Sequence, residues 1–164
     1  MLRWPPAAVL LLAACSPAGD APADPPSAVA APTTSSEGLP PGLAVLTPDD
    51  YAADPLSGEL ACAFTADGGT LLAMRGNVAD RTGRAEGLVK VGARRLLGQA
   101  DEPGGYDGLP DGTGFSADGL TIAVELVSNT PLAGGESPPY PARLIARWAT
   151  GTERTYEGTW TCGP

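Results

Sequence analysis

The 164-residue chain contains no histidine, a single lysine and few aromatic residues. Without histidine it lacks the side chain that most often serves as a general base, a metal ligand or a pH switch near neutrality. Aromatic residues make up only 5 % of the chain, whereas glycine (22 residues) and proline (18 residues) together make up nearly a quarter. This composition disfavours a helical bundle or a large α/β enzyme and favours short strands joined by many turns.

Charge excludes a further class of partner. The net charge is −9, and the basic residues are nearly all arginine. Binding to a phosphate backbone requires clustered Lys or Arg side chains that release counterions, so we expect no nucleic-acid partner. The acidic residues are scattered through turns and loops, which is typical of a solvated surface.

The N-terminus has the pattern of an export signal. Arg3 is followed by an apolar run of eight residues over 7–14. Eight helical residues extend about 12 Å, far less than the roughly 30 Å hydrocarbon core of a bilayer. The run is therefore too short to span a membrane and fits the apolar region of a signal peptide. Its last three residues and the next one read Leu12-Ala13-Ala14-Cys15.

This tetrapeptide resembles the lipobox of bacterial lipoproteins, in which the cysteine thiol receives a diacylglyceryl group and a peptidase cuts just before it. The resemblance implies that residues 1–14 are a signal peptide and that Cys15 is the lipidated N-terminal residue of the mature chain. Several acyl chains exceed the two signals needed for stable anchoring. Because Ser16 rather than aspartate follows the cysteine, the resemblance favours the outer membrane. An ordinary secretory signal with an incidental cysteine is the alternative.

A linker and one domain follow. Residues 15–42 are rich in proline, alanine and serine and offer few side chains for a core, so we expect a lipid-anchored spacer. Residues 43–164 alternate apolar and polar residues in short runs that are bounded by glycine, which predicts β-strands. Gly92-Ala93 and Asp118-Gly119 are expected hairpin turns. The domain is predicted to be all-β, a small antiparallel barrel or sandwich of about eight strands.

Two cysteines remain in the domain, Cys62 and Cys162, 100 residues apart. Export places them in an oxidising compartment, where paired thiols form disulfides. Pairing requires Cα atoms within roughly 4.4–6.8 Å, so the first clear strand and the last strand must be neighbours or face each other across a sandwich. Closing so long a loop stabilises the fold by roughly 4.7 kcal/mol in the chain-entropy picture. A free redox thiol and a metal pair are the alternatives.

No nucleophile elbow, phosphate-binding glycine loop or zinc-binding pair is present, so we expect no enzyme, metal or cofactor. The loop Asp101–Gly112 holds the best candidate site residues, Tyr106, Asp107 and Asp111, as a partner-binding loop. A solvated loop, a calcium site and a carboxylate pair for glycoside hydrolysis are the alternatives. The spacing of Asp107, Asp111 and Asp118 does not match the spacing of the calcium ligands in an EF-hand.

The layout of lipobox, spacer, early cysteine, β-domain and late cysteine resembles the membrane-bound inhibitors of c-type lysozyme. The segments that carry the resemblance are Glu86–Gly98, Gly105-Tyr106 and Thr159–Cys162. It implies an eight-stranded antiparallel barrel and a lysozyme-like hydrolase as partner. That family inserts a Ser-Gly-x-x-Tyr loop into the lysozyme cleft; Gly104-Gly105-Tyr106 lacks the serine and the spacing. The inhibitory residues are therefore not transferred.

These observations predict a lipid-anchored lipoprotein of the cell envelope whose β-domain is a non-catalytic binding module. The acidic surface suits a basic partner such as a lysozyme-like hydrolase, because complementary charge speeds encounter. A structural or assembly lipoprotein without a dedicated ligand is the alternative function.

The lipobox interpretation yields a direct test. We expect Cys15→Ala to stop lipidation and to leave unprocessed precursor, because a thiolate is the nucleophile that accepts the lipid. Metabolic labelling with palmitate measures the lipid, and the mobility of the precursor measures processing. Palmitate label at the normal level on the substituted chain would contradict the interpretation.

Overall fold

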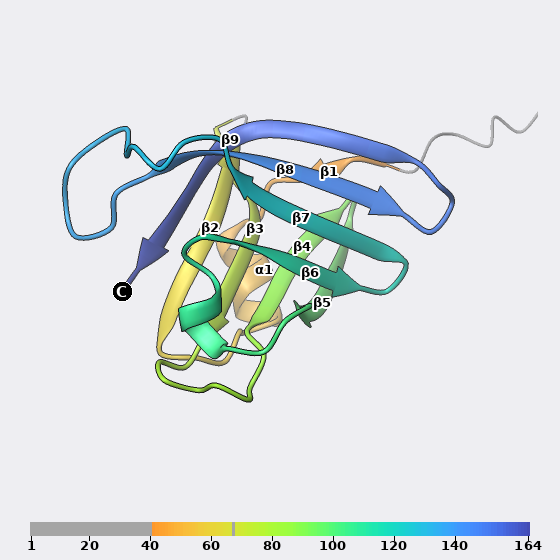
Figure 1. Ribbon diagram of the computed structural model, residues 1–164. Coiled ribbons are helices and arrows are strands. Elements are labelled where there is room, and N and C mark those ends of the chain that lie inside the picture. Colours follow the sequence, from red (N-terminus) through yellow and green to blue (C-terminus); the bar gives the residue numbers. More distant parts are fainter. Residues whose placement is uncertain (1–40, 67) are drawn as a thin grey trace, which may run out of the picture. The chain divides into compact units, whose positions relative to one another are not determined.

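The computed structural model describes residues 41–66 and 68–164, which form an all-β domain (Figure 1). The expected signal peptide 1–14, the lipidation site Cys15 and nearly all of the expected linker 15–42 lie outside the described residues. Eight strands follow one another along the chain: β2 (Leu60–Ala66), β3 (Gly69–Gly76), β4 (Glu86–Val91), β5 (Arg94–Ala100), β6 (Gly112–Ala117), β7 (Leu120–Leu126), β8 (Tyr140–Trp148) and β9 (Glu153–Gly163).

Each of these strands pairs antiparallel with the next one, and β9 pairs back onto β2. The sheet is therefore an eight-stranded closed barrel rather than a sandwich, which decides between the two predicted architectures. The turn predictions are confirmed: Val91 pairs with Arg94 across Gly92-Ala93, and Ala117 pairs with Leu120 across Asp118-Gly119. Both turn glycines have positive φ, at +60° and +70°, a conformation that side chains with a Cβ rarely adopt.

A short ninth strand, β1 (Leu43–Ala44), lies at the start of the domain. It pairs with Lys90 and Val91 of β4, beyond the residues of β4 that pair with β3. The backbone N–H of Leu43 also donates to the hydroxyl of Tyr156 in β9, at 2.9 Å. The strand therefore links two barrel strands, β4 and β9, that do not pair with each other.

The barrel interior is filled by side chains, as expected for eight strands. Its largest fully buried side chains are Trp160, Phe64 and Phe115. Inward glycines make room for these rings: a Cβ on Gly98 would lie 2.8 Å from the Phe115 ring, and one on Gly158 would lie 2.9 Å from the Phe64 ring. Few aromatic residues thus suffice for the core, because glycines opposite them accommodate their volume.

The predicted disulfide joins Cys62 and Cys162. The two residues are direct partners in the β2–β9 ladder, next to the pair formed by Phe64 and Trp160. Their Cα atoms are 4.1 Å apart, slightly closer than the roughly 4.4 Å lower end of the usual range. The covalent link therefore lies at the seam that closes the barrel.

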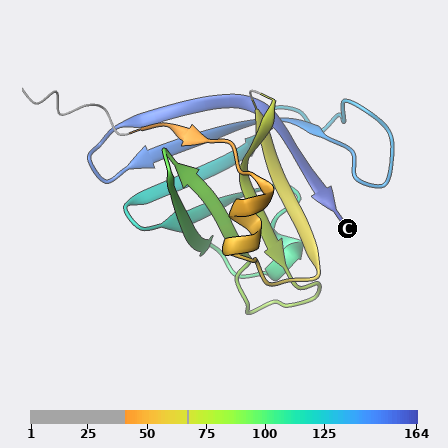
Figure 2. The same ribbon diagram turned by 180° about the vertical axis from the view of Figure 1, so that it is seen from behind.

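Helix α1 (Pro48–Ala53) packs on the outside of the barrel, as Figure 2 shows from behind. The helix follows its N-cap, Thr47, and ends at Ala53, two residues before Pro55. Apolar contact holds the segment in place, because Leu46 and Leu56 cover the outward-facing side chain of Leu88. Within the described residues, no helix is long and apolar enough to cross a membrane.

Asp50 fixes α1 to the barrel through charge. Its side chain is buried at 3 % exposure and accepts hydrogen bonds from Lys90 Nζ at 2.9 Å and from the backbone N–H and hydroxyl of Thr47, both at 2.8 Å. The Arg95 guanidinium lies 3.6 Å away. The hydrogen bonds from Lys90 and then Thr47 outweigh burial and hold the pKa of Asp50 well below its ordinary value.

Asp50 should therefore make folding stability depend on pH. Because its folded-state pKa is depressed, its contribution is present above the ordinary value of 3.8 and is lost as pH falls below that value. We expect Asp50→Asn to have a lower urea midpoint than the unsubstituted chain at pH 7. The gap between the two midpoints should become smaller as the pH falls from about 4 to about 2, because the unsubstituted chain then loses the contribution of the Asp50 carboxylate. Asp118→Asn is the control, since the Arg94–Asp118 pair is exposed and should contribute little. Equal midpoint shifts for the two variants would refute the assignment.

Candidate functional site

The two ends of the barrel differ in their connections. At one end, here called the hairpin end, tight turns join β4 to β5, β6 to β7 and β8 to β9. At the other, the loop end, three longer loops connect the strands: residues 77–85, 101–111 and 127–139. In Figure 1 these turns lie toward the right, and the long loops lie toward the left and the bottom. The candidate residues Tyr106, Asp107 and Asp111 belong to the middle loop.

This middle loop folds over the loop end of the barrel. The N–H groups of Gly104 and Gly105 donate to the carbonyl of Gly83 at 2.9 and 3.0 Å, and that of Tyr106 donates to Asn77 at 2.9 Å. The approach is too close for larger residues, since a Cβ on Gly76 would lie 2.5 Å from the Tyr106 nitrogen. Loops 77–85 and 101–111 are therefore held together by backbone hydrogen bonds.

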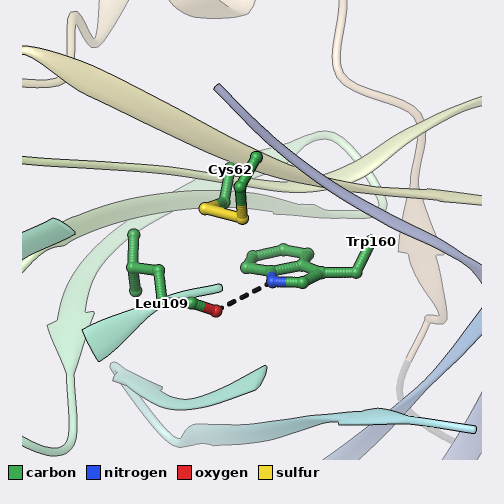
Figure 3. Close-up of a disulfide and its surroundings, with 4 residues drawn as sticks. Cys62, Leu109 and Trp160 are labelled. Atoms are coloured by element: carbon green, nitrogen blue, oxygen red, sulfur yellow. Dashed lines mark hydrogen bonds between the residues drawn. A yellow bond between two sulfur atoms is a disulfide. The ribbon is translucent and has the colours of Figure 1, made fainter. Parts of the chain in front are cut away.

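Trp160 ties the same loop to the core. Its indole N–H donates to the carbonyl of Leu109 at 2.9 Å, and both residues are almost fully buried. Figure 3 shows the indole ring beside the Cys62 disulfide and the hydrogen bond from its nitrogen to the carbonyl oxygen of Leu109. Loop 101–111, including the 3-10 helix η1 (Gly105–Gly108), thus acts as a plug that closes one end of the barrel.

The structure separates the three candidate residues by role. Tyr106 is partly buried against the core, and burial, followed by the charge of Asp107, raises the pKa of its hydroxyl. The carboxylate of Asp107 accepts the N–H of Ala79 at 3.0 Å, which ties the plug to a residue with a positive φ of 58°. Asp111 is exposed. Two candidates therefore help to build the plug, and one faces solvent.

Carboxylates outnumber cations on the loop end. The three loops carry six carboxylates and two arginines: Asp80, Asp101, Glu102, Asp107, Asp111, Glu136, Arg81 and Arg84. Three of the carboxylates accept hydrogen bonds from the domain itself, for example that of Asp101 from Ser116. Glu102, Asp111 and Glu136 are exposed and have no hydrogen bond or ion pair in the described part of the chain. These three carboxylates are available to an external cation.

Apolar side chains are exposed on the same loops. Val78, Val127 and Leu132 are 47 %, 61 % and 64 % exposed, half of the large hydrophobic residues that the domain exposes. A hollow of about 190 Å³ lies nearby between Tyr106 and Tyr140 and is flanked by Pro110 and Pro138. Sequence reasoning missed these three residues, because a single apolar residue in a loop has no periodicity to mark it.

The described residues give no support for a metal or a carboxylate pair. Residues 41–66 and 68–164 contain no cluster of three metal-ligating side chains. The side chain of Asp107 is engaged by Ala79, whereas Asp111 stands alone on the surface. The arrangement is that of a surface with acidic and apolar side chains, of which loops 77–85 and 101–111 are held together by backbone hydrogen bonds.

Comparison with known proteins adds no assignment: no protein-family model, curated protein or solved structure matches the chain.

The role of Trp160 in holding the plug can be tested with a conservative variant. Trp160→Phe keeps a ring in the core but leaves the buried Leu109 carbonyl without its donor, at a cost of about 1–3 kcal/mol. We expect a lower free energy of unfolding and faster amide exchange across residues 101–111. Trp148→Phe is the matched control, because the Trp148 N–H has no partner among the described residues. Unchanged exchange in loop 101–111 of Trp160→Phe would contradict the plug.

Proposed function

We propose that this chain is a lipid-anchored cell-envelope lipoprotein whose β-domain is a non-catalytic binding module, and that its loop end binds a basic protein such as a lysozyme-like hydrolase. The observation that carries the proposal is the combination of uncommitted carboxylates with exposed Val127 and Leu132 on adjacent loops. Lipid anchoring rests on the lipobox at Leu12–Cys15 and favours the outer membrane through Ser16.

Rigidity favours binding at this end. The plug is fixed by backbone hydrogen bonds to Asn77 and Gly83 and by the Trp160–Leu109 bond to the core. A surface that is already ordered loses little conformational entropy when a partner binds. The carboxylates would then steer a cationic partner toward the loop end, and the exposed apolar side chains would supply contact area.

The position of the first described residue is compatible with this role. Pro41, the first described residue, lines a hollow at the hairpin end together with Arg94 and Asp118. The chain therefore enters the domain at the end opposite to the acidic loops. A partner bound at the loop end would not meet the point of attachment.

A charge-reversal variant tests the binding role. We expect the triple variant Glu102→Lys, Asp111→Lys, Glu136→Lys to bind c-type lysozyme at least about tenfold more weakly, because like charges repel and association slows. Binding is measured by surface plasmon resonance at low and physiological salt, and the unsubstituted chain should lose affinity as salt screens the attraction.

A second triple variant controls for net charge. Asp49→Lys, Asp118→Lys, Glu157→Lys changes the charge by the same amount at exposed positions outside the three loops. It should retain most of the affinity. Equal losses in the two variants would remove the loop end as the binding surface. No binding of lysozyme by the unsubstituted chain would overturn the partner class and favour the structural or assembly lipoprotein.

A further inference from the structure

The hollow at the loop end, here called the tyrosine hollow, has a size and a lining of its own. Its volume is about 190 Å³, which is below the range of about 300–1,000 Å³ for small-molecule sites. A space of this size suits a single side chain of a protein partner. The plug, the segment before and at the start of β8, and β9 each contribute two lining residues: Tyr106 and Pro110, Pro138 and Tyr140, and Trp160 and Cys162.

The walls of the tyrosine hollow are fixed by contacts within the domain. Tyr140 is the direct partner of Trp160 in the β8–β9 ladder, and the indole N–H of Trp160 holds the Leu109 carbonyl of the plug. A Cβ on Gly163 would collide with Ser137, so the loop before β8 lies directly against the end of β9. A hollow that is formed before binding requires little ordering when a side chain enters it.

The two tyrosines determine which chemistry the hollow can offer. The face of a tyrosine ring attracts a cation, and a flat guanidinium can stack on it. Neither the Tyr106 nor the Tyr140 hydroxyl has a hydrogen-bond partner among residues 41–66 and 68–164, so both oxygens can accept an N–H group. None of the six lining residues carries a charge, so a cation that enters meets no positive side chain in the lining.

The charge around the tyrosine hollow is negative. Asp111 and Glu136 lie one and two residues along the chain from its prolines. Both side chains are exposed and have no hydrogen bond or ion pair within the described part of the chain. Burial, and then the charge of Asp107, raises the pKa of the Tyr106 hydroxyl. A negative field therefore reaches a tyrosine of the hollow itself.

We propose that the tyrosine hollow binds one arginine side chain of the basic partner, with the guanidinium against the rings of Tyr106 and Tyr140 and its N–H groups directed to the carboxylates of Asp111 and Glu136. This inference rests on the proposed function, because it names the group that the loop end recognises. Arginine is favoured over lysine, since a guanidinium stacks on a ring and donates several hydrogen bonds at once, whereas an ammonium is a compact point charge.

Small cations test the hollow without a protein partner. N-acetyl-arginine methylamide and N-acetyl-lysine methylamide carry the same charge, and each is titrated into the ¹⁵N-labelled mature chain, residues 15–164 with Cys15→Ser. The backbone amide shifts of loop 101–111 and of Tyr140 report binding. We expect saturable shifts with both compounds, and at least about threefold tighter binding of the arginine compound.

Tyrosine variants locate the site. Tyr140→Leu removes one ring and should weaken binding of the arginine compound at least about threefold. Tyr140→Phe keeps the ring and should bind more tightly than Tyr140→Leu. Tyr51→Leu is the matched control, because Tyr51 is an exposed tyrosine on α1, outside the three long loops; its affinity should be unchanged.

Carboxylate variants provide a second route, which decides the matter if circular dichroism shows that Tyr140→Leu does not fold. The double variant Asp111→Asn, Glu136→Gln removes two charges beside the hollow and should weaken binding of the arginine compound at least about threefold. Asp49→Asn, Glu157→Gln removes the same charge at exposed positions outside the long loops and should bind normally.

The outcomes separate this inference from the proposed function. Equal affinity for the two compounds, no saturable shift in loop 101–111, or equal losses in a variant and its matched control would overturn the arginine site, even if lysozyme binds the loop end. Saturable binding of the arginine compound with no binding of lysozyme would support the hollow and overturn the lysozyme-like partner.

Discussion

The pairing of β2 with β9 is the contact on which the rest of the structure depends. It closes the barrel, and the Cys62–Cys162 disulfide lies within it. Without this pairing both strands would be open edges with unpaired backbone groups. Trp160 is only two residues from Cys162 and points into the same interior, where its N–H holds Leu109. The closure of the sheet therefore also determines where the plug loop lies.

The interior shows how a chain with few aromatic residues builds a core. Three of its aromatic side chains, Phe64, Phe115 and Trp160, lie fully buried inside the barrel. Glycines such as Gly98 and Gly158 face two of these rings, at positions where any side chain would collide with them. From the sequence alone, the many glycines indicate only turns. In the structure, some of them also make room for ring packing within strands.

The two ends of the barrel have different physical characters. The loop end is sealed by the plug and presents carboxylates and exposed apolar side chains. The hairpin end is hollow, is lined by apolar side chains and contains the unpaired N–H of Trp148. β1 and α1 lie on the side wall, where β1 pairs with β4 and the Asp50–Lys90 ion pair holds α1. The two ends of one small barrel therefore present different surfaces.

The sequence by itself determined the strands, the turns and the all-β class, because period-two alternation and glycine turns are local properties of the chain. It also predicted the Cys62–Cys162 pair, since the expected export to an oxidising compartment and a count of two cysteines in the domain left one partner for each. Whether the sheet closed as a barrel or split into a sandwich depended on which strands became neighbours, and only the tertiary structure decided that. The same holds for the site: Asp107 looked like a free carboxylate until the fold placed Ala79 beside it. Contacts between residues distant in sequence depend on how the strands are arranged in space, which local pattern does not specify.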